Sequence, residues 1–283
     1  MITLPEAFEQ EMKQLLGEEE YEAYCKTFDE AVHRGLRVNN GKISTEEFLR
    51  RTDIPLKKVP WIPNGFYYDE ESCNPAKDAD YYAGLYYLQE PSAMTPASRL
   101  PIEPDDRVLD LCAAPGGKAT ELGSRIGEGG MLLANDISNS RAKALLRNLE
   151  IQGVGRLLVT SEDPEKLVTL YPAFFDKILL DAPCSGEGMF RKESSMLRYY
   201  SENGPEHYVP IQKKLIEQAY QMLAEGGELL YSTCTFSVKE NEEVIAGLLD
   251  AHPDMEVQEI TPGYEGFAPG VSVNGRDLSR CVH

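Results

Sequence analysis

Two cysteines lie directly after apolar segments that are expected to form strands. Cys184 stands in 178-ILLDAPCSGEGMFRK-192 and Cys234 in 230-LYSTCTFS-237. A thiol at the carboxyl end of a strand can be an idle buried residue, a metal ligand, half of a disulfide or a nucleophile. None of the six cysteines, at positions 25, 73, 112, 184, 234 and 281, belongs to a C-x-x-C pair or to a Cys/His cluster with zinc-ligand spacing. The sequence therefore predicts no metal site.

The surroundings of Cys184 and Cys234 favour reactive thiols over idle ones. Ligands of open parallel sheets bind in the crevice at the carboxyl ends of the strands, and the two strands concerned would be neighbours in a doubly wound sheet. Both thiols would then open onto the same crevice. Their loops contain Pro, Gly, Ser and Thr, which are typical of exposed polar turns. We therefore interpret both cysteines as reactive.

Three other loops at strand ends predict a site for S-adenosylmethionine. In 112-CAAPGGK-118, two glycines allow a tight turn and a close approach of the backbone to a ligand, at the start of a helix that favours an acceptor group. Asp136 ends the next strand, where it could accept two ribose hydroxyls, and Asp163 could accept from an adenine amino group. Each acid could instead cap a turn or a helix. The predicted cofactor-binding residues are Cys112, Ala113, Ala114, Pro115, Gly116, Gly117, Lys118, Asp136, Asp163 and Asp181.

The elements that must position these loops follow a regular order. Through most of the chain, apolar strands alternate with amphipathic helices, which indicates βαβ units and a mostly parallel, doubly wound sheet with helices on both faces. The front of the chain contains helical segments, short strands and a capping pattern, Ser44 or Thr45 ahead of Glu47. We therefore predict an α/β protein with a small N-terminal α+β module over residues 1–80 and a larger domain over residues 81–283.

Composition and charge restrict the class of protein. The 283 residues are 42% hydrophobic, as in an ordinary globular chain, and no apolar run approaches the roughly 20 residues that span a bilayer. The N-terminus carries acids where a secretory signal needs basic residues, so we expect a cytoplasmic location without disulfides. The net charge of −19 argues against nucleic-acid binding unless basic residues gather on one face.

Four motifs carry a resemblance to a known family: LDLCAAPGGKAT, LLANDIS-x-x-R, LLDAPCSGEGMFRK and YSTCTF-x-x-x-ENE. They are similar to motifs of the RNA (cytosine-5)-methyltransferases of the Sun/nucleolar-protein family, and the front of the chain resembles the branch of the bacterial ribosomal RNA small-subunit methyltransferase F. The resemblance covers essentially the whole chain. It implies a Rossmann-like class I methyltransferase core, S-adenosylmethionine as cofactor and formation of 5-methylcytosine in 16S ribosomal RNA. The implied partner is ribosomal RNA or the small ribosomal subunit.

The resemblance also implies the catalytic roles. Carbon 5 of cytosine becomes nucleophilic when a thiolate adds to carbon 6, and the resemblance assigns that thiolate to Cys234. Asp181 stands where the family contacts nitrogen 3 of the base, and Cys184 matches the cysteine that assists release of the product RNA. We infer in addition that Lys118 polarises the site or holds Asp181 in place.

Other functions remain open on the sequence. A DNA cytosine-5 methyltransferase would use Cys184 as its nucleophile and leave Cys234 unused. A protein that kept the fold and lost the chemistry would be a catalytically silent RNA-binding fragment, and a small-molecule methyltransferase would not need the N-terminal module. Members of the resembled branch continue with a further strand and a C-terminal RNA-binding region, so we expect the domain to be cut short at His283.

The substrate predicts further contacts. A base within a duplex cannot present carbon 6 to a thiol, so the target must be single-stranded or flipped out. Tyr199, Tyr200 and Tyr208 follow the first cysteine loop and could stack on bases or anchor that loop. The N-terminal module is predicted to bind RNA. Basic residues that could contact the RNA backbone, or simply be solvated, are Arg50, Arg51, Lys57, Lys58, Arg191, Lys192, Arg198, Lys213 and Lys214.

Overall fold

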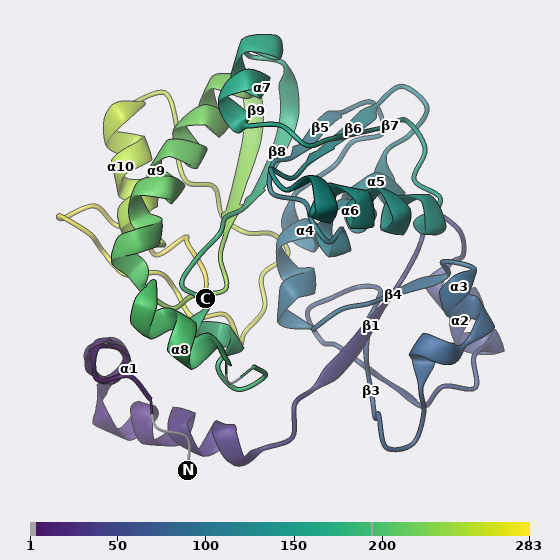
Figure 1. The fold of residues 1–283 in the computed structure, drawn as a ribbon, viewed down its shortest axis with the longest axis horizontal. Coiled ribbons are helices and arrows are strands. Elements are labelled where there is room, and N and C mark those ends of the chain that lie inside the picture. Colours follow the sequence, from purple (N-terminus) through teal and green to yellow (C-terminus); the bar gives the residue numbers. More distant parts are fainter. Residues whose placement is uncertain (1–3, 194) are drawn as a thin grey trace.

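The computed structural model describes residues 4–193 and 195–283 and contains two separate β-sheets (Figure 1). The N-terminal part comprises α1 (Glu6–Lys26), β1 (Arg34–Val38), α2 (Thr45–Arg51), β2 (Leu56–Lys58), β3 (Gly65–Tyr68), α3 (Ala79–Tyr82) and β4 (Tyr86–Leu88). The remainder comprises α4 (Thr95–Arg99), β5 (Arg107–Asp110), α5 (Gly117–Arg125), β6 (Met131–Asn135), α6 (Asn139–Gln152), β7 (Leu157–Thr160), α7 (Pro164–Leu170), β8 (Phe175–Asp181), α8 (Ser195–Glu202), α9 (Pro205–Met222), β9 (Leu223–Ser232) and α10 (Glu242–Ala251). No helix among these residues is long and apolar enough to cross a membrane.

The larger sheet is parallel and confirms the predicted doubly wound core. Its strand order is β7-β6-β5-β8-β9, and every neighbouring pair is parallel. The central strands are unbroken apolar runs, such as residues 178–180 in β8, which are fully buried because helices cover both faces. The strand order reverses between β5 and β8, and ligands bind beyond the carboxyl ends of the strands at such a switch point.

Two hydrophobic layers enclose this sheet. On one face it packs against α7, α9 and α10 through residues such as Ile216 and Leu248, and on the other against α4, α5 and α6 through residues such as Leu122 and Leu149. Figure 1 shows these two groups of helices on opposite sides of the strands. Each fully buried side chain of this size contributes about 1.5–3 kcal/mol of transfer free energy, so the layers hold the strand ends firmly in place.

The smaller sheet is antiparallel, with the strand order β2-β3-β1-β4, and its centre is formed around the fully buried Leu36. α2 begins at the predicted cap, because the Ser44 hydroxyl accepts a hydrogen bond from the Glu47 N–H at 3.1 Å. The fourth strand, β4, lies beyond residue 80 and pairs with β1. The sheet of the N-terminal module therefore extends to Leu88.

Helix α1 packs on the larger domain and away from the small sheet. It consists of two helical stretches that meet at Gly17, whose φ of 78° favours glycine. The ring of Phe8 lies 5.1 Å from that of Phe190 and 6.2 Å from that of Tyr200, and Figure 1 shows α1 beside α8. Tyr200 and Tyr208 are both buried, so they anchor this region and are unavailable for stacking on bases.

The C-terminal segment, residues 252–283, contains turns and two isolated bridges. Near its end, Val282 makes a single antiparallel bridge with Pro269. The ring of Tyr264 lies 5.3 Å from that of Trp61 in the N-terminal module. The segment therefore contacts both parts of the molecule.

Candidate active site

The sulfur atoms of Cys184 and Cys234 lie 3.1 Å apart, although the residues are 50 positions apart in the sequence. The pairing of Asp181 in β8 with Ser232 in β9 explains this contact. The two strands end side by side, and each loop brings its cysteine two or three residues later to the same place. Cys234 is exposed and Cys184 is partly buried. The structure thus brings together the two thiols that the sequence singled out.

The contact between the two thiols shifts their pKa values in opposite directions. The hydrogen bond with Cys184 lowers the pKa of Cys234, against the opposing effects of partial desolvation and of the Asp181 charge, and the Lys118 ammonium lowers that pKa further. The same hydrogen bond, together with burial, raises the pKa of Cys184 well above its ordinary value. Because the thiolate is the reactive form of cysteine, these opposite shifts favour ionisation of Cys234 over ionisation of Cys184.

Asp181 is held by two neighbours at the end of β8. Its Oδ2 lies 2.7 Å from Lys118 Nζ, and its Oδ1 accepts a hydrogen bond from Ser232 Oγ at 2.7 Å. Lys118 belongs to the first turn of α5, so this ion pair joins the loop after β5 to the strand that leads to the first cysteine. Both carboxylate oxygens are engaged, which restricts the side chain to one orientation.

Glu240 is a fully buried carboxylate that the sequence predictions missed. It accepts hydrogen bonds from the N–H of Ser185 at 3.1 Å, from the Ser185 hydroxyl, and from Gln212 Nε2 at 2.7 Å. The Ser185 hydroxyl also lies 2.9 Å from Thr235 Oγ1. Ser185 directly follows the first cysteine and Thr235 directly follows the second, so this network ties the two cysteine loops together. Its sequence signal was the ENE motif that follows STCTF.

The glycine loop, residues 112–118, turns sharply into α5. Gly116 precedes the helix with a φ of 113°, a left-handed conformation that favours glycine. Side chains of α6 hold two carbonyl oxygens of the loop: Arg141 donates to Ala114 O at 2.9 Å and Asn148 donates to Pro115 O at 2.7 Å. The first turn of α5 therefore begins at a fixed place beside the switch point, where its N–H groups attract an acceptor.

The two acidic residues predicted to contact the ribose and the adenine, Asp136 and Asp163, differ in burial. Asp136 is buried at the end of β6, where its Oδ1 accepts from the Ser138 N–H at 2.9 Å and its Oδ2 lies 3.2 Å from Arg141. Asp163 is exposed and caps α7 by accepting from the Glu165 N–H at 2.9 Å. Both acids make the local contacts that were weighed as the alternative. Arg141 also holds the glycine loop, so Asp136 is connected to that loop.

Asp110, at the end of β5, is a second residue that the predictions missed. It is fully buried, and neither carboxylate oxygen has a hydrogen-bond partner in the described part of the chain. Burial, together with the charge of Asp181, raises the pKa of Asp110 to about 8. A buried carboxylate without partners at a switch point is a candidate acceptor for a positively charged ligand. Its sequence signal was an acid two residues before the glycine loop.

A cleft of about 2050 Å³ opens over Cys234, Asp181 and Lys118, with walls from the N-terminal module, the larger domain and the C-terminal segment. Of the basic residues predicted to contact RNA, Arg191 and Lys192 line this cleft, and the other seven lie outside its lining. No group of His, Cys, Asp and Glu side chains in the described ranges, 4–193 and 195–283, is arranged to hold a metal ion.

The parallel sheet, its switch point and the motifs at its strand ends define a Rossmann-like methyltransferase fold. Two family models match the chain: residues 97–276 match "16S rRNA methyltransferase RsmB/F", and residues 4–91 match "N-terminal domain of 16S rRNA methyltransferase RsmF". The chain therefore belongs to the RsmB/F family of 16S rRNA methyltransferases. This confirms the predicted family and its F branch.

Curated relatives agree with this assignment. The chain is 38% identical over 262 residues to "Ribosomal RNA small subunit methyltransferase F" of Erwinia tasmaniensis, and 35% identical over 262 residues to the protein of that name from Escherichia coli O157:H7. In both cases the match covers 89% of this chain and 55% of the relative. The chain thus spans about half the length of the curated relatives it matches.

Solved structures confirm the predicted fold. A methyltransferase homolog protein from Pyrococcus horikoshii has a TM-score of 0.81 at 30% identity, covering 98% of this chain and 88% of that chain. The structure titled PH0851 has a TM-score of 0.83 at 27% identity, covering 94% of this chain and 61% of that one. NSun6 from Pyrococcus horikoshii with SFG has a TM-score of 0.80 at 23% identity, covering 97% and 92%, and is evidence for the fold alone.

Proposed function

We propose that this chain forms 5-methylcytosine in 16S ribosomal RNA, with S-adenosylmethionine as the methyl donor and Cys234 as a covalent nucleophile. The observation that carries the proposal is the pair of thiols 3.1 Å apart, in which the pKa of the exposed Cys234 is lowered and that of Cys184 is raised. The names of the family and of the curated relatives support the substrate class. The proposed place of action is the cytoplasm, on ribosomal RNA or the small subunit.

The residues at the switch point fit S-adenosylmethionine, which supplies an electrophilic methyl group when bound. Asp110 is a buried carboxyl group without a hydrogen-bond partner in the described part of the chain, and a positive charge bound beside it would favour its ionised form; the first turn of α5 offers N–H groups to a carboxylate. The glycine loop, residues 112–118, would line the same space. We propose Asp136 as the partner of the ribose hydroxyls. An adenine contact by Asp163 is supported by its place after β7, although this residue also caps α7.

The proposed reaction begins when the Cys234 thiolate adds to carbon 6 of the cytosine, which forms a carbon–sulfur bond and makes carbon 5 nucleophilic. The lowered pKa of Cys234 supports this step because it increases the thiolate fraction at neutral pH. Asp181 hydrogen-bonds the base at or near nitrogen 3. Lys118 and Ser232 keep its carboxylate in a single orientation for this contact.

The reaction ends when carbon 5, which has gained the methyl group, loses its hydrogen as a proton to solvent. The electrons of that bond re-form the double bond between carbons 5 and 6, and the bond from carbon 6 to sulfur breaks, which releases the Cys234 thiolate. Cys184 assists this release, since it keeps its own proton and hydrogen-bonds the sulfur that leaves. In the DNA-type alternative Cys184 would attack the base. That order requires the thiol with the raised pKa to ionise before the thiol with the lowered pKa, so the electrostatics oppose it.

The proposal is tested by incubating the chain with S-adenosylmethionine and an unmodified 16S ribosomal RNA transcript or small subunit, and measuring 5-methylcytidine by mass spectrometry of the nucleosides. We expect product with the wild-type chain and none with Cys234→Ala. Cys184→Ala serves as the matched variant, because it changes the neighbouring thiol. Methylation that persists in Cys234→Ala and disappears in Cys184→Ala would contradict the proposal and support the DNA-type arrangement.

A further inference from the structure

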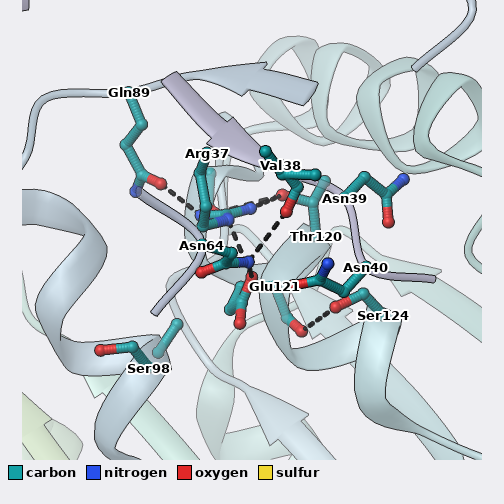
Figure 2. Close-up of polar contacts among 12 residues, drawn as sticks. Arg37, Val38, Asn39, Asn40, Asn64, Gln89, Ser98, Thr120, Glu121 and Ser124 are labelled. Atoms are coloured by element: carbon teal, nitrogen blue, oxygen red, sulfur yellow. Dashed lines mark hydrogen bonds and ion pairs between the residues drawn. The ribbon is translucent and has the colours of Figure 1, made fainter. Parts of the chain in front are cut away.

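Arg37 connects the N-terminal module to the glycine loop, and Figure 2 shows its side chain among residues of both parts of the molecule. This side chain is almost fully buried, with 2% exposed. Nη1 donates to Gly117 O at 2.7 Å and to Gln89 Oε1, and Nη2 donates to Thr120 Oγ1 at 2.7 Å. Nε lies 2.8 Å from Glu121 Oε2. One guanidinium from β1 thus contacts three residues in the first turns of α5.

A charge network surrounds this guanidinium. Burial of a charged group destabilises a protein unless an opposite charge and hydrogen bonds compensate it. Glu121 supplies the charge, and its Oε2 accepts from Asn64 Nδ2 at 3.2 Å while Arg125 Nε lies 3.8 Å from its Oε1. Asn64 also donates to Val38 O at 2.8 Å, so β1 and the residue directly before β3 both take part. Directional contacts of this kind fix one orientation of α5 relative to the small sheet, which nonpolar packing would not do.

The atom that Arg37 holds belongs to the glycine loop. Two other carbonyl oxygens of that loop are held by α6 of the same domain, whereas Gly117 O accepts from Arg37 of the N-terminal module in addition to Thr120 Oγ1 of α5 at 3.1 Å. A Cβ atom at Gly117 would lie 2.9 Å from Gln89 Nε2, so the residue after β4 also packs directly on the loop. The next residue, Lys118, carries the ammonium that lies 2.7 Å from Asp181. A shift of Gly117 therefore moves both the turn and the partner of the catalytic carboxylate.

We propose that Arg37 is a positioning residue for binding of S-adenosylmethionine, and that the N-terminal module sets the conformation of the glycine loop in addition to its proposed contact with RNA. The identity of the ligand rests on the proposed function, but the effect on the loop does not. Without Arg37, Gly117 O loses a donor and Glu121 remains buried without its nearest counter-charge. The first turn of α5 then becomes less ordered. Cofactor affinity falls, because binding must supply the free energy needed to order that turn.

Lys42 offers a matched control in the same segment of the N-terminal module. Its Nζ donates to Ala83 O and to Ile151 O, both at 2.7 Å, so it holds the C-terminal end of α6. A helix that follows a parallel strand runs back toward the amino edge of the sheet, so this contact lies away from the glycine loop. Lys42→Met therefore removes one positive charge from the same interface without touching the start of α5.

Hydrogen exchange of the ligand-free chain tests the effect on the loop. For Arg37→Met we expect about tenfold faster exchange of the amides of residues 117–121, because a hydrogen bond from a charged donor is lost. Lys42→Met is expected to speed up amide exchange in residues 150–154 and to leave the exchange rates of residues 117–121 unchanged. Arg37→Lys keeps the charge without the planar fork, should give an intermediate rate, and replaces the Met variant if that one does not fold. Unchanged exchange of 117–121 in the Arg37 variants, or equal acceleration in Lys42→Met, would overturn the inference.

Calorimetric titration with S-adenosylmethionine, at a temperature well below the unfolding midpoint of each variant, measures the consequence for binding. We expect the Kd to rise about tenfold for Arg37→Met and less than about twofold for Lys42→Met. Equal Kd values in wild type and Arg37→Met would overturn the positioning role. A wild-type chain that binds no S-adenosylmethionine would contradict the proposed function, and the exchange comparison would still decide whether Arg37 holds the loop.

Discussion

The glycine loop and the two cysteine loops meet the same physical requirement in different ways. Both leave the carboxyl ends of parallel strands, where sheet hydrogen bonding stops and the loop needs other polar partners. The cysteine loops are held from within the larger domain by two fully buried side chains, Glu240 and Gln212. The glycine loop is held partly by α6 and partly by Arg37 of the N-terminal module. Damage to the module should therefore reach the cofactor half of the site before it reaches the cysteine pair.

Helix α1 sharpens the contrast, because the N-terminal chain contacts both halves by different means. On the cysteine side, Phe8 packs against aromatic rings, and Glu11 accepts a hydrogen bond from Ser237 Oγ at 2.7 Å. On the cofactor side, the contact is a buried charge network around Arg37. The cysteine side thus combines aromatic packing, which is not directional and tolerates small shifts, with one charged hydrogen bond, whereas the cofactor side has several charged hydrogen bonds that fix orientation. The two contacts therefore differ in how strongly they control loop geometry.

The largest effect is expected at the nucleophile. Cys234→Ala should lower methylation by at least about 10⁴-fold, because the covalent step is lost. The Kd for S-adenosylmethionine should stay within about twofold of wild type, since the residue belongs to the cysteine half. Single-turnover methylation and calorimetry measure the two quantities. A similar loss of S-adenosylmethionine binding in Cys234→Ala would show that the cofactor half and the cysteine half of the site are not independent.

Glu240→Ala should disturb the cysteine half, because Glu240 accepts the hydrogen bonds that hold the two cysteine loops together. Ser185 and Gln212 would keep buried donors without an acceptor, so we expect the free energy of unfolding to fall by about 3 kcal/mol and methylation to fall by about 100-fold. Glu240→Gln keeps the size and one acceptor oxygen, so it should lose less stability and less methylation activity than Glu240→Ala. Urea denaturation followed by circular dichroism measures stability. Native stability and activity in Glu240→Ala would mean that the cysteine loops are held by other contacts.

The acidity of Cys234 depends on its neighbour. Cys184→Ala removes the hydrogen bond that lowers the pKa of Cys234, so the thiolate should form only at higher pH. Alkylation of Cys234 at neutral pH should slow by about tenfold, because a smaller fraction of the thiol is ionised. Rates of iodoacetamide labelling across neutral and alkaline pH, with the labelled peptide identified by mass spectrometry, check this. A pH profile that moves toward lower pH would contradict the assigned donor.

The last effect, on stability at Asp110, depends on pH. Its pKa is raised from 3.8 to about 8 in the folded chain, so between these values the folded state holds a proton that the unfolded state has released. Stability therefore decreases as pH rises through this window. Asp110→Asn removes the dependence, and its Tm advantage over wild type should grow steadily from the acidic to the alkaline end of this window. The same variant should bind S-adenosylmethionine more weakly, and a Tm difference that does not change with pH would contradict the raised pKa.

Local patterns were enough to predict the elements of the larger domain and the meeting of its cysteines. Apolar strands that alternate with helices allow few topologies, and in these the strands before Cys184 and Cys234 are neighbours. The cap at Ser44 was also predictable, because it depends on residues three positions apart. Site residues that lie at the ends of predicted strands, such as Asp181, Cys184 and Cys234, could therefore be identified from the sequence alone.

Contacts between distant elements could not be predicted in this way. Arg37 lies in a short strand, and its burial depends on α5, whose contacting carbonyl is 80 residues away. Glu240 looks like an acid at a helix start, but its partners are 28 and 55 residues away. Charged side chains are almost always exposed unless they are paired, so composition predicts the wrong environment for both. Only the packed structure provides the partners that make their burial stable.

The covalent adduct is the most direct test of Cys234 as the nucleophile. Cys184→Ala, incubated with S-adenosylmethionine and the 16S ribosomal RNA transcript, should accumulate a protein–RNA species that survives a denaturing gel, because addition and methyl transfer proceed while elimination stalls. The double variant Cys184→Ala/Cys234→Ala is the control and should give no such band. A missing band in Cys184→Ala under conditions where wild type methylates the RNA, or a band in the double variant, would contradict a covalent role for Cys234.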